Sequence, residues 1–230
     1  MRDYKMEAAV AAVEFVKEGQ TIGLGAGTTI FHLTDLIGTN PGLAQTLTFV
    51  SSSFKTRNYL YKKGLKIQSA GFTENLDIYF DGCDQFDKAL NALKSGGGIH
   101  TSEKILASMA TEFILIGDEG KSVAALDHTY PLVIEILPEA LPLVLRKIGS
   151  LYPESNVKLR MSSEKDGALI SENGNLLADI QFPVLPPLAE VNVIVKMIPG
   201  IVEHSLFYGL ATKAVIAGEQ GITIMEPQRS

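Results

Sequence analysis

One stretch of the chain, residues 77–103, collects the residue types that acid–base chemistry needs. They are two aspartates, a lysine and a glutamate: Asp81, Asp84, Lys94 and Glu103. A short apolar run, residues 78–80, comes directly before the first aspartate, and three consecutive glycines stand between the lysine and the glutamate. Because ligands of open α/β sheets bind beyond the carboxyl ends of the strands, this stretch predicts a site for proton transfer.

Two carboxylates and an ammonium group can share the work of moving a proton between adjacent carbon atoms. Asp81 and Asp84 are separated by a bend at Gly82, and carboxylates held close together can divide acid and base roles. Glu103 is expected near the N-terminus of a helix, facing the same pocket. A carboxylate base that forms an enediolate needs an electrophile, which Lys94 and the amides of the glycine turn would supply.

These residues also have ordinary structural interpretations. The two aspartates could bind a hard cation, or could only form a turn, which is the commonest role of Asp-Gly. Glu103 could complete a capping box after Thr101 and Ser102, and Lys94 could simply be solvated. Cys83 is expected to fill a small buried space, because no histidine is near enough in sequence to activate it. The histidines lack metal-ligand spacing, which disfavours a zinc site.

A second polar segment, residues 25–29, reads Gly-Ala-Gly-Thr-Thr and follows an expected strand. Glycine amides and the N-terminus of the helix that comes next suit an anion such as phosphate. The alternative is a tight connection in which Thr28 or Thr29 caps the helix. The segment is neither a P-loop nor a dinucleotide fingerprint, because no Gly-Lys-Ser/Thr follows and no glycine stands three residues beyond Gly27. We therefore expect a small phosphorylated substrate.

Strands and helices are expected to alternate through the first half of the chain. The expected helices run from an N-cap at Asp3 to Gly19, from residue 30, from residue 54 to Gly64, and from residue 105. The expected strands cover residues 21–24, 47–50, 65–67, 78–80 and 113–116. Polar or glycine-rich sequences follow three of them, near residues 25, 81 and 118. This alternation predicts an α/β fold with a mostly parallel sheet.

The pattern changes near residue 126, and residues 128–131 resemble a crossing linker. Beyond it we expect strands at 132–136 and 158–161, helices at 142–148 and 188–195, and a hairpin of 169–171 with 176–180. Asn173-Gly174 predicts a type I′ turn in that hairpin. Two further strands, 213–217 and 222–225, end the chain. We assign residues 1–128 and 203–230 to a larger domain, and residues 129–202 to a smaller α+β domain.

Composition excludes several classes of protein. The 230 residues are 46% hydrophobic and 20% charged, as in a soluble globular protein. The formal net charge of −6 disfavours nucleic acid as the main partner. The single cysteine excludes an internal disulfide. No secretory segment and no apolar run of about 18 residues is present, so we expect a cytoplasmic protein without a membrane partner.

Several short motifs run through most of the chain in a fixed order. They are residues 25–29, 81–84, 94–98, 101–105 with 107–108, 118 with 121, 173–175 and 199–202. In order and spacing these motifs resemble the type A family of ribose-5-phosphate isomerases. The resemblance implies a Rossmann-like α/β domain with a smaller α+β domain, in a homo-oligomer that we expect to be a dimer.

The resemblance also implies an activity and a set of site residues. The activity is a metal-free and cofactor-free aldose–ketose isomerisation of ribose 5-phosphate and ribulose 5-phosphate. Glu103 would carry the proton between C1 and C2, while Asp81, Asp84 and Lys94 would open the ring, handle hydroxyl protons and stabilise the enediolate. The threonine turn and Lys121 would hold the phosphate. The candidate substrate-binding residues are Ala26, Gly27, Thr28, Thr29, Asp81, Gly82, Cys83, Asp84, Lys94, Ser95, Gly96, Gly97 and Lys121.

The chain departs from the family pattern at five positions, Ala26, Cys83, Gln85, Ser95 and Ser102. Ala26 removes one hydroxyl from the phosphate turn, which would weaken binding by about 1 kcal/mol. Ser95 replaces a glycine and would restrict the turn that supplies amides. No proposed catalytic group is lost, so these changes bear on substrate affinity and rate.

Two other classes of function compete with an isomerase. A non-catalytic sugar-phosphate sensor would need no base, so Glu103 speaks against it, and no DNA-binding segment is evident. A coenzyme A transferase or a sugar-phosphate deaminase of similar fold is the other rival. A transferase would need a nucleophilic glutamate and room for a long cofactor.

Overall fold

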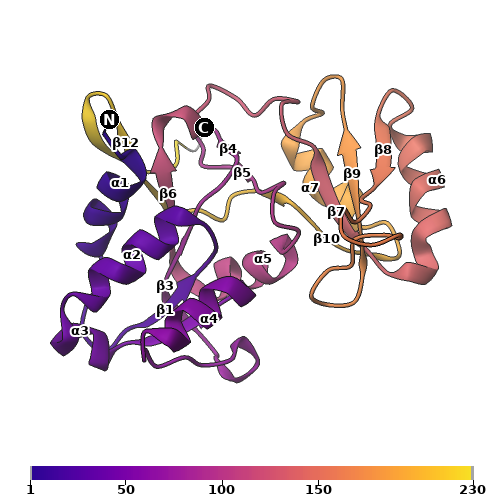
Figure 1. Ribbon diagram of the computed structural model, residues 1–230. Helices are drawn as coiled ribbons and strands as arrows, with labels where there is room; N and C mark the ends of the chain where they lie inside the picture. The colour runs from indigo at the N-terminus through magenta and orange to yellow at the C-terminus, as the bar shows by residue number, and fades with distance from the viewer. Residues whose placement is uncertain (1, 229–230) are drawn as a thin grey trace.

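The computed structural model describes residues 2–228 and contains a six-stranded sheet. Its strands are β1 (Thr21–Leu24), β2 (Thr48–Ser51), β3 (Leu76–Asp81), β6 (Ala110–Asp118), β12 (Lys213–Gly218) and β13 (Gly221–Met225). They lie in the order β13-β12-β6-β3-β1-β2, and only the pair β12 and β13 is antiparallel. The prediction of a mostly parallel sheet is confirmed, and the last two strands of the chain return to it (Figure 1).

Helices cover both faces of this sheet. They are α1 (Tyr4–Val13), α2 (Thr28–Gly38), α3 (Pro41–Thr46), α4 (Phe54–Lys62) and α5 (His100–Met109). Successive strand residues point to opposite faces, so Phe80 packs with Leu33 of α2, while its neighbour Tyr79 packs with Leu106 of α5. The polar ends of the central strands are thereby fixed between two apolar layers.

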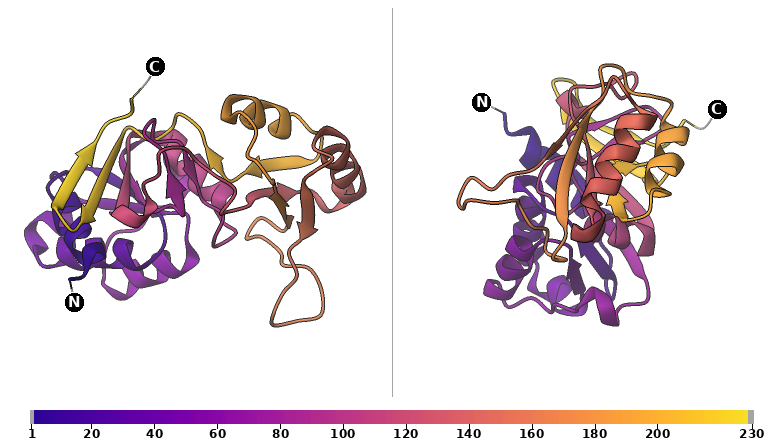
Figure 2. Two further views of the ribbon diagram at one scale, coloured as in Figure 1. Left: turned by 90° about the horizontal axis from the view of Figure 1, so that it is seen from above. Right: turned by 90° about the vertical axis from the view of Figure 1, so that its right-hand side faces the viewer.

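A second sheet of four antiparallel strands lies beside the first (Figures 1 and 2). Its strands, in the order β10-β7-β9-β8, are β7 (Leu132–Ile136), β8 (Asn156–Leu159), β9 (Leu176–Gln181) and β10 (Ile201–His204). Helices α6 (Leu141–Leu151) and α7 (Leu188–Lys196) pack on one face of it through Val144 and Val191. The assignment of residues 1–128 and 203–230 to one domain and 129–202 to another stays a prediction. Strand β10 extends across the predicted boundary between residues 202 and 203.

Short elements complete the structure. The two-residue strands β4 (Gln85–Phe86), β5 (Ala92–Leu93) and β11 (Leu206–Phe207) form a third sheet in the order β11-β5-β4. Three 3₁₀ turns are η1 (Ala70–Phe72), η2 (Glu119–Lys121) and η3 (Pro138–Ala140). Such strands are too short to show an alternating pattern, so the sequence did not predict them. Among residues 2–228, no helix is long and apolar enough to cross a membrane.

Some predicted element boundaries were wrong. The first helix begins after its predicted cap, Asp3, but ends at Val13 rather than at Gly19. Residues 65–67 form no strand and only one bridge, between Ile67 and Phe49. The strand predicted at 158–161 begins two residues earlier, at Asn156. Leu65, Ile67 and Leu159 are only partly buried, and Met161 is 60% exposed, so the apolar residues of these segments are weak indicators of a strand.

The predicted hairpin near residue 173 is less regular than a type I′ hairpin. Residues 169–171 contribute only an isolated bridge, between Ile170 and Leu176. Gly174 has a φ of 81°, whereas Asn173 is not among the non-glycine residues with positive φ. A type I′ turn needs positive φ at both central residues, so the prediction was wrong. The amide of Ser171 donates to the carbonyl of Asn175, and the amide of Gly174 donates to the carbonyl of Ser171, which fits a longer, bulged turn.

Candidate active site

The three strands with polar ends, β1, β3 and β6, are immediate neighbours in the six-stranded sheet. Their carboxyl ends therefore meet at one edge, where a cavity of about 220 Å³ opens. It is lined by Ala26, Gly27, Asp81, Gly82, Cys83, Asp84, Lys94, Gly96, Gly97, Ile99 and Glu103. The structure thus brings together all four residues that were predicted to do the chemistry.

Lys94 occupies the centre of this group. Its Nζ lies 2.8 Å from Oδ2 of Asp81 and 3.4 Å from Oε1 of Glu103, and it donates to the carbonyl oxygen of Gly82 at 2.5 Å. The lysine is only 7% exposed, so the interpretation as a solvated side chain was wrong. Burial opposes its charge, but Asp81 and Glu103 outweigh burial and raise the pKa of Lys94. The site therefore holds a stable ammonium group between two carboxyl groups.

Glu103 is buried in the first turn of α5 and faces Lys94. Burial raises the pKa of Glu103 to about 8, the charge of Lys94 opposes that rise, and the charge of Asp81 adds to it. The cap residue of α5 is Ile99, and no side chain caps the helix. Glu103 is therefore not part of a capping box. A buried carboxyl group with a raised pKa, beside a fixed cation, is suited to accept and return a proton.

Asp84 uses one carboxylate oxygen to fix the glycine turn. Its Oδ2 accepts from the amides of Ser95, at 2.6 Å, and Gly96, at 3.0 Å. We had expected the amides of this turn to stabilise an enediolate. The amides of Ser95 and Gly96 are not free to do so, because both donate to Asp84. Among residues 2–228, no group of three or more His, Cys, Asp or Glu side chains is placed to hold a metal ion.

Asp81 is the last residue of β3, and its carboxylate lies against Gly25, the residue that follows β1. A Cβ atom added to Gly25 would lie 1.9 Å from Cγ of Asp81. Sequence reasoning placed Gly25 in a phosphate turn, whereas the structure gives it a second role, namely to admit this carboxylate. Tyr79, two residues before Asp81 and thus on the same side of the strand, also contacts it and was missed.

We predict that Gly25→Ala displaces Asp81 and impairs both stability and activity. The free energy of unfolding should fall by about 1–3 kcal/mol, as for other overpacked sites. Gly38→Ala is the matched control, because a Cβ atom there meets no atom within 4 Å. Chemical denaturation and steady-state rates measure both effects. Equal behaviour of the two variants would contradict the close packing of Gly25 and Asp81.

The second sheet holds the glycine turn and the start of α5 in place. Nη2 of Arg160 donates to the carbonyl oxygen of Ser95 at 2.6 Å, and the Ser95 hydroxyl donates to the carbonyl oxygen of Pro131 at 2.5 Å. The hydroxyl of Thr101 donates to Glu135 of β7, which is 1% exposed. Neither Arg160 nor Glu135 was predicted, because partners so distant in sequence leave no local signal.

Several predicted substrate-binding residues lie outside the lining of the cavity. They are Thr28, Thr29, Ser95 and Lys121. The cap of α2 is Gly27, with a φ of 103°, so neither threonine caps the helix. Ser95 is buried, and Lys121 lies in η2 close enough for its charge to act on Cys83. The threonines and Lys121 therefore stand beside the cavity rather than in it.

Cys83 lines the cavity as a neutral thiol. Burial raises the pKa of Cys83 to about 12, and the positive charge of Lys94 only partly opposes the rise. A thiol with so high a pKa is a poor nucleophile at neutral pH. This agrees with the expectation that Cys83 has no nucleophilic role.

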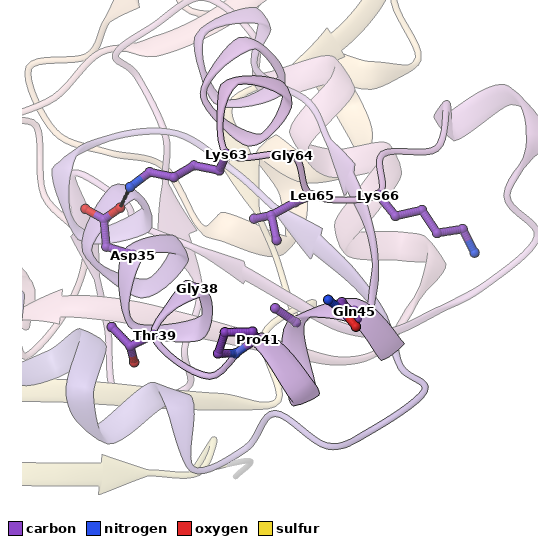
Figure 3. A pocket seen from close by; sticks show the side chains of 10 residues that line it. Asp35, Gly38, Thr39, Pro41, Gln45, Lys63, Gly64, Leu65 and Lys66 are labelled. Carbon is purple, nitrogen blue, oxygen red and sulfur yellow. Dashed lines mark ion pairs between the residues drawn. The ribbon is translucent and has the colours of Figure 1, made fainter.

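A larger cavity, of about 740 Å³, lies between α2, α3 and α4 (Figure 3). Its charged residues include Asp35 and Lys63, which are paired with each other at 2.7 Å across its rim (Figure 3). None of the four residues with predicted chemistry lines it. Size therefore does not identify the reactive site, whereas the buried charges at the strand ends do.

Comparisons with known proteins show the family of the chain. The family model described as Ribose 5-phosphate isomerase A (phosphoriboisomerase A) matches residues 48–221. Ribose-5-phosphate isomerase A of Thermosynechococcus vestitus is 34% identical over 221 residues, which cover 95% of this chain and 92% of the relative.

Solved structures show the same fold. The ribose 5-phosphate isomerase A of Methanocaldococcus jannaschii has a TM-score of 0.89 and 29% identity, covering 97% of this chain and 98% of that one. A D-ribose-5-phosphate isomerase in complex with phospho-erythronic acid has a TM-score of 0.90 and 29% identity, covering 97% of each chain. The chain described here belongs to the ribose 5-phosphate isomerase A family.

Proposed function

We propose that this protein interconverts D-ribose 5-phosphate and D-ribulose 5-phosphate through an enediolate, a step of the non-oxidative pentose phosphate pathway. Membership of the isomerase family supports the reaction, and the complex of a related structure with phospho-erythronic acid supports a phosphorylated sugar-like ligand. The observation that carries the proposal is the buried ammonium of Lys94 between the carboxyl groups of Asp81 and Glu103.

Glu103 is assigned as the base. Its carboxylate takes the proton from C2 of the open-chain aldose, and the electron pair moves onto the carbonyl oxygen at C1 to give the enediolate. The proton of the C2 hydroxyl then passes to the C1 oxygen, by way of the carboxylate of Asp84. As the carbonyl forms at C2, the carboxylic acid of Glu103 returns its proton to C1, so the base is regenerated. The ammonium of Lys94 stabilises the negative oxygen during both steps. The raised pKa of Glu103 brings its basicity close to neutral pH, where such a transfer is most efficient.

Asp84 is assigned to the hydroxyl protons and to ring opening. Its Oδ2 is occupied by two amides, and within residues 2–228 no donor is hydrogen-bonded to its Oδ1. That oxygen is therefore available to a substrate hydroxyl in the cavity. The two amides fix the orientation of the Asp84 carboxylate through Oδ2, and Oδ1 stays open to the ligand. This arrangement suits a carboxylate that positions a ligand.

The phosphate is assigned to the N-terminus of α2 and to Lys121. The amide of Ala26 is not part of this phosphate site, because it donates to Oδ1 of Asp81 at 3.2 Å. The amides of Gly27, Thr28 and Thr29 begin the helix and carry the positive end of its dipole. This arrangement explains how the chain can bind a phosphate although Ala26 brings no hydroxyl.

The test is conversion of ribose 5-phosphate to ribulose 5-phosphate by the purified protein in the presence of a chelator. Turnover that survives the chelator is the expected result, since no metal is assigned to the site. Thermal stabilisation by ribose 5-phosphate without any turnover would overturn the isomerase and favour the sensor. A covalent mass shift after incubation with an acyl-coenzyme A would favour the transferase.

We predict that kcat/KM falls as the pH is lowered through about 8. The reaction needs Glu103 as a carboxylate, and burial raises its pKa to about 8, so protonation of the free enzyme removes the base below that pH. A pH–rate profile of kcat/KM measures the midpoint of the acid limb. A midpoint near the ordinary value of 4.5 for a glutamate would contradict the raised pKa of this buried carboxyl group.

Two further properties belong to the same proposal. We assign a homodimer, which the family resemblance supports, and a cytoplasmic location, which the composition supports. No metal and no organic cofactor is assigned. Light scattering of the purified protein measures the oligomeric state.

A further inference from the structure

The carboxylate of Asp81 has a complete set of protein hydrogen-bond donors. Oδ1 accepts from the amides of Ala26, at 3.2 Å, and Gly82, at 2.8 Å. Oδ2 accepts from the hydroxyl of Tyr79, at 2.6 Å, and contacts Nζ of Lys94 at 2.8 Å. A carboxylate offers about four lone-pair positions, so none is left over for a substrate hydroxyl. Asp81 is also only 1% exposed.

Tyr79 is built into the core as a fixed donor. It is fully buried, and its ring packs on Phe113 with the ring centroids 5.1 Å apart. A Cβ atom added to Gly23 would lie 2.7 Å from Cδ2 of Tyr79, so the ring packs directly against Gly23 of β1, in the space that a side chain there would fill. Burial and then the charge of Asp81 raise the pKa of Tyr79 well above its usual range. The hydroxyl therefore stays protonated and donates a hydrogen bond to Asp81.

We propose that Tyr79 is a positioning residue, whose hydroxyl fixes Oδ2 of Asp81 so that Asp81 serves as a permanent anchor for the ammonium of Lys94 rather than as an acceptor of substrate protons. This inference rests on the proposed isomerase function. It divides the two aspartates by role: Asp84 keeps an open oxygen for the substrate, and Asp81 has none.

The position of the ammonium influences the basicity of Glu103, which burial raises and the charge of Lys94 lowers. Lys94 has three N–H groups, and their acceptors are the carbonyl of Gly82, Oδ2 of Asp81 and Oε1 of Glu103. Without the Tyr79 hydroxyl, Oδ2 of Asp81 is short of a donor and draws the ammonium closer. The contact from Lys94 to Glu103, already the longest at 3.4 Å, then lengthens. Because the charge of Lys94 lowers the pKa of Glu103, that pKa rises further.

The chain supplies a matched control on helix α4. The hydroxyl of Tyr59 donates to Oδ1 of Asp35 at 2.6 Å, Lys63 pairs with the same oxygen at 2.7 Å, and the Tyr59 ring packs on Phe31 at 4.7 Å. Tyr59 belongs to α4, and the Asp35–Lys63 pair lies at the rim of the 740 Å³ cavity (Figure 3). Tyr59→Phe therefore removes a hydrogen bond of the same kind, from a tyrosine hydroxyl to an aspartate that is paired with a lysine, at a place remote from Glu103.

The experiment compares Tyr79→Phe with Tyr59→Phe in the complete protein. In Tyr79→Phe we expect kcat to fall about tenfold, the value of one hydrogen bond to a charged group, with KM changed less than about twofold. The acid limb of its pH profile should move to higher pH. The titrating group is Glu103, the charges facing it are Lys94 and Asp81, and a more distant Lys94 lowers the pKa of Glu103 less. Tyr59→Phe should leave kcat, KM and the profile unchanged.

A second measurement tests whether Tyr79 acts through the carboxylate of Asp81. Asp81→Asn removes the anion through which Tyr79 acts, so adding Tyr79→Phe to it should cost little further activity. Multiplicative effects of the two substitutions, or identical kinetics of Tyr79→Phe and the unaltered protein, would overturn the proposal. Failure of the unaltered protein to isomerise ribose 5-phosphate would instead refute the proposed function, so the two failures are distinguishable.

Discussion

Glu103→Gln lowers the turnover of ribose 5-phosphate about 10³-fold in our expectation, within the range found for general acid–base catalysis. The substitution keeps the shape of the side chain and removes its ability to accept a proton from carbon. Glu103 lies opposite Lys94, whose ammonium can still contact the amide oxygen of glutamine. Binding of the sugar phosphate should therefore remain nearly intact, and the loss should appear in kcat rather than KM.

Steady-state kinetics and thermal stabilisation by ribose 5-phosphate measure the two parts of this prediction. Glu112→Gln is the control, because Glu112 lies in β6, is 40% exposed and pairs only loosely with Lys213 at 3.7 Å. Its kinetics should match those of the unaltered protein. Near-normal turnover in Glu103→Gln would remove Glu103 from the role of base, whatever its pKa.

The parallel sheet was predictable because its signals are local. An apolar run such as residues 113–116, followed by glycine and aspartate, is typical of a buried strand. That the polar ends of β1, β3 and β6 share one edge also followed, since ligands of such a sheet bind beyond the carboxyl ends of its strands, whereas the order of the strands came only from the structure. The strands β4, β5 and β11 were not predictable, because two residues carry no periodicity.

The residue types predicted the chemistry of the site, but they did not predict the different roles of its two aspartates. Asp81 and Asp84 look equivalent in sequence, yet one is surrounded by donors and the other is hydrogen-bonded through a single oxygen. That difference depends on the amide of Ala26, some 55 residues away, and on the conformation of the glycine turn. The donors come from elements that meet only in the folded protein, so no spacing in the sequence reports them.

Lys94→Met should have the second large effect, because it leaves two carboxyl groups in the interior without their cation. The methionine side chain is of similar length and brings no charge. Breaking a buried ion pair by removing one partner costs about 3–5 kcal/mol, and the electrophile for the enediolate is lost at the same time. We expect turnover to fall below detection and the free energy of unfolding to drop by that amount at alkaline pH.

The pH dependence of stability in Lys94→Met follows from Glu103. Burial raises the folded-state pKa of Glu103 above its ordinary value of 4.5, and Lys94 is the group that opposes the rise. Without Lys94 the pKa rises above about 8. A carboxyl group with a raised pKa contributes stability that is fully present below 4.5 and is lost as the pH rises through the folded-state value. The variant should therefore lose stability from acidic to alkaline pH, and more steeply than the unaltered protein near pH 8.

Urea denaturation at several pH values measures this slope, and Lys63→Met shows what a surface pair contributes. Lys63 pairs with Asp35 at 2.7 Å, close to the 2.8 Å between Lys94 and Asp81, but the side chain of Lys63 is 44% exposed. Exposed ion pairs contribute about 0–1 kcal/mol, so this control should be almost as stable as the unaltered protein at every pH. The same small effect in Lys94→Met would mean that water reaches the two carboxyl groups. The site would then lack the buried, paired charges on which the assignment of Glu103 as the base depends.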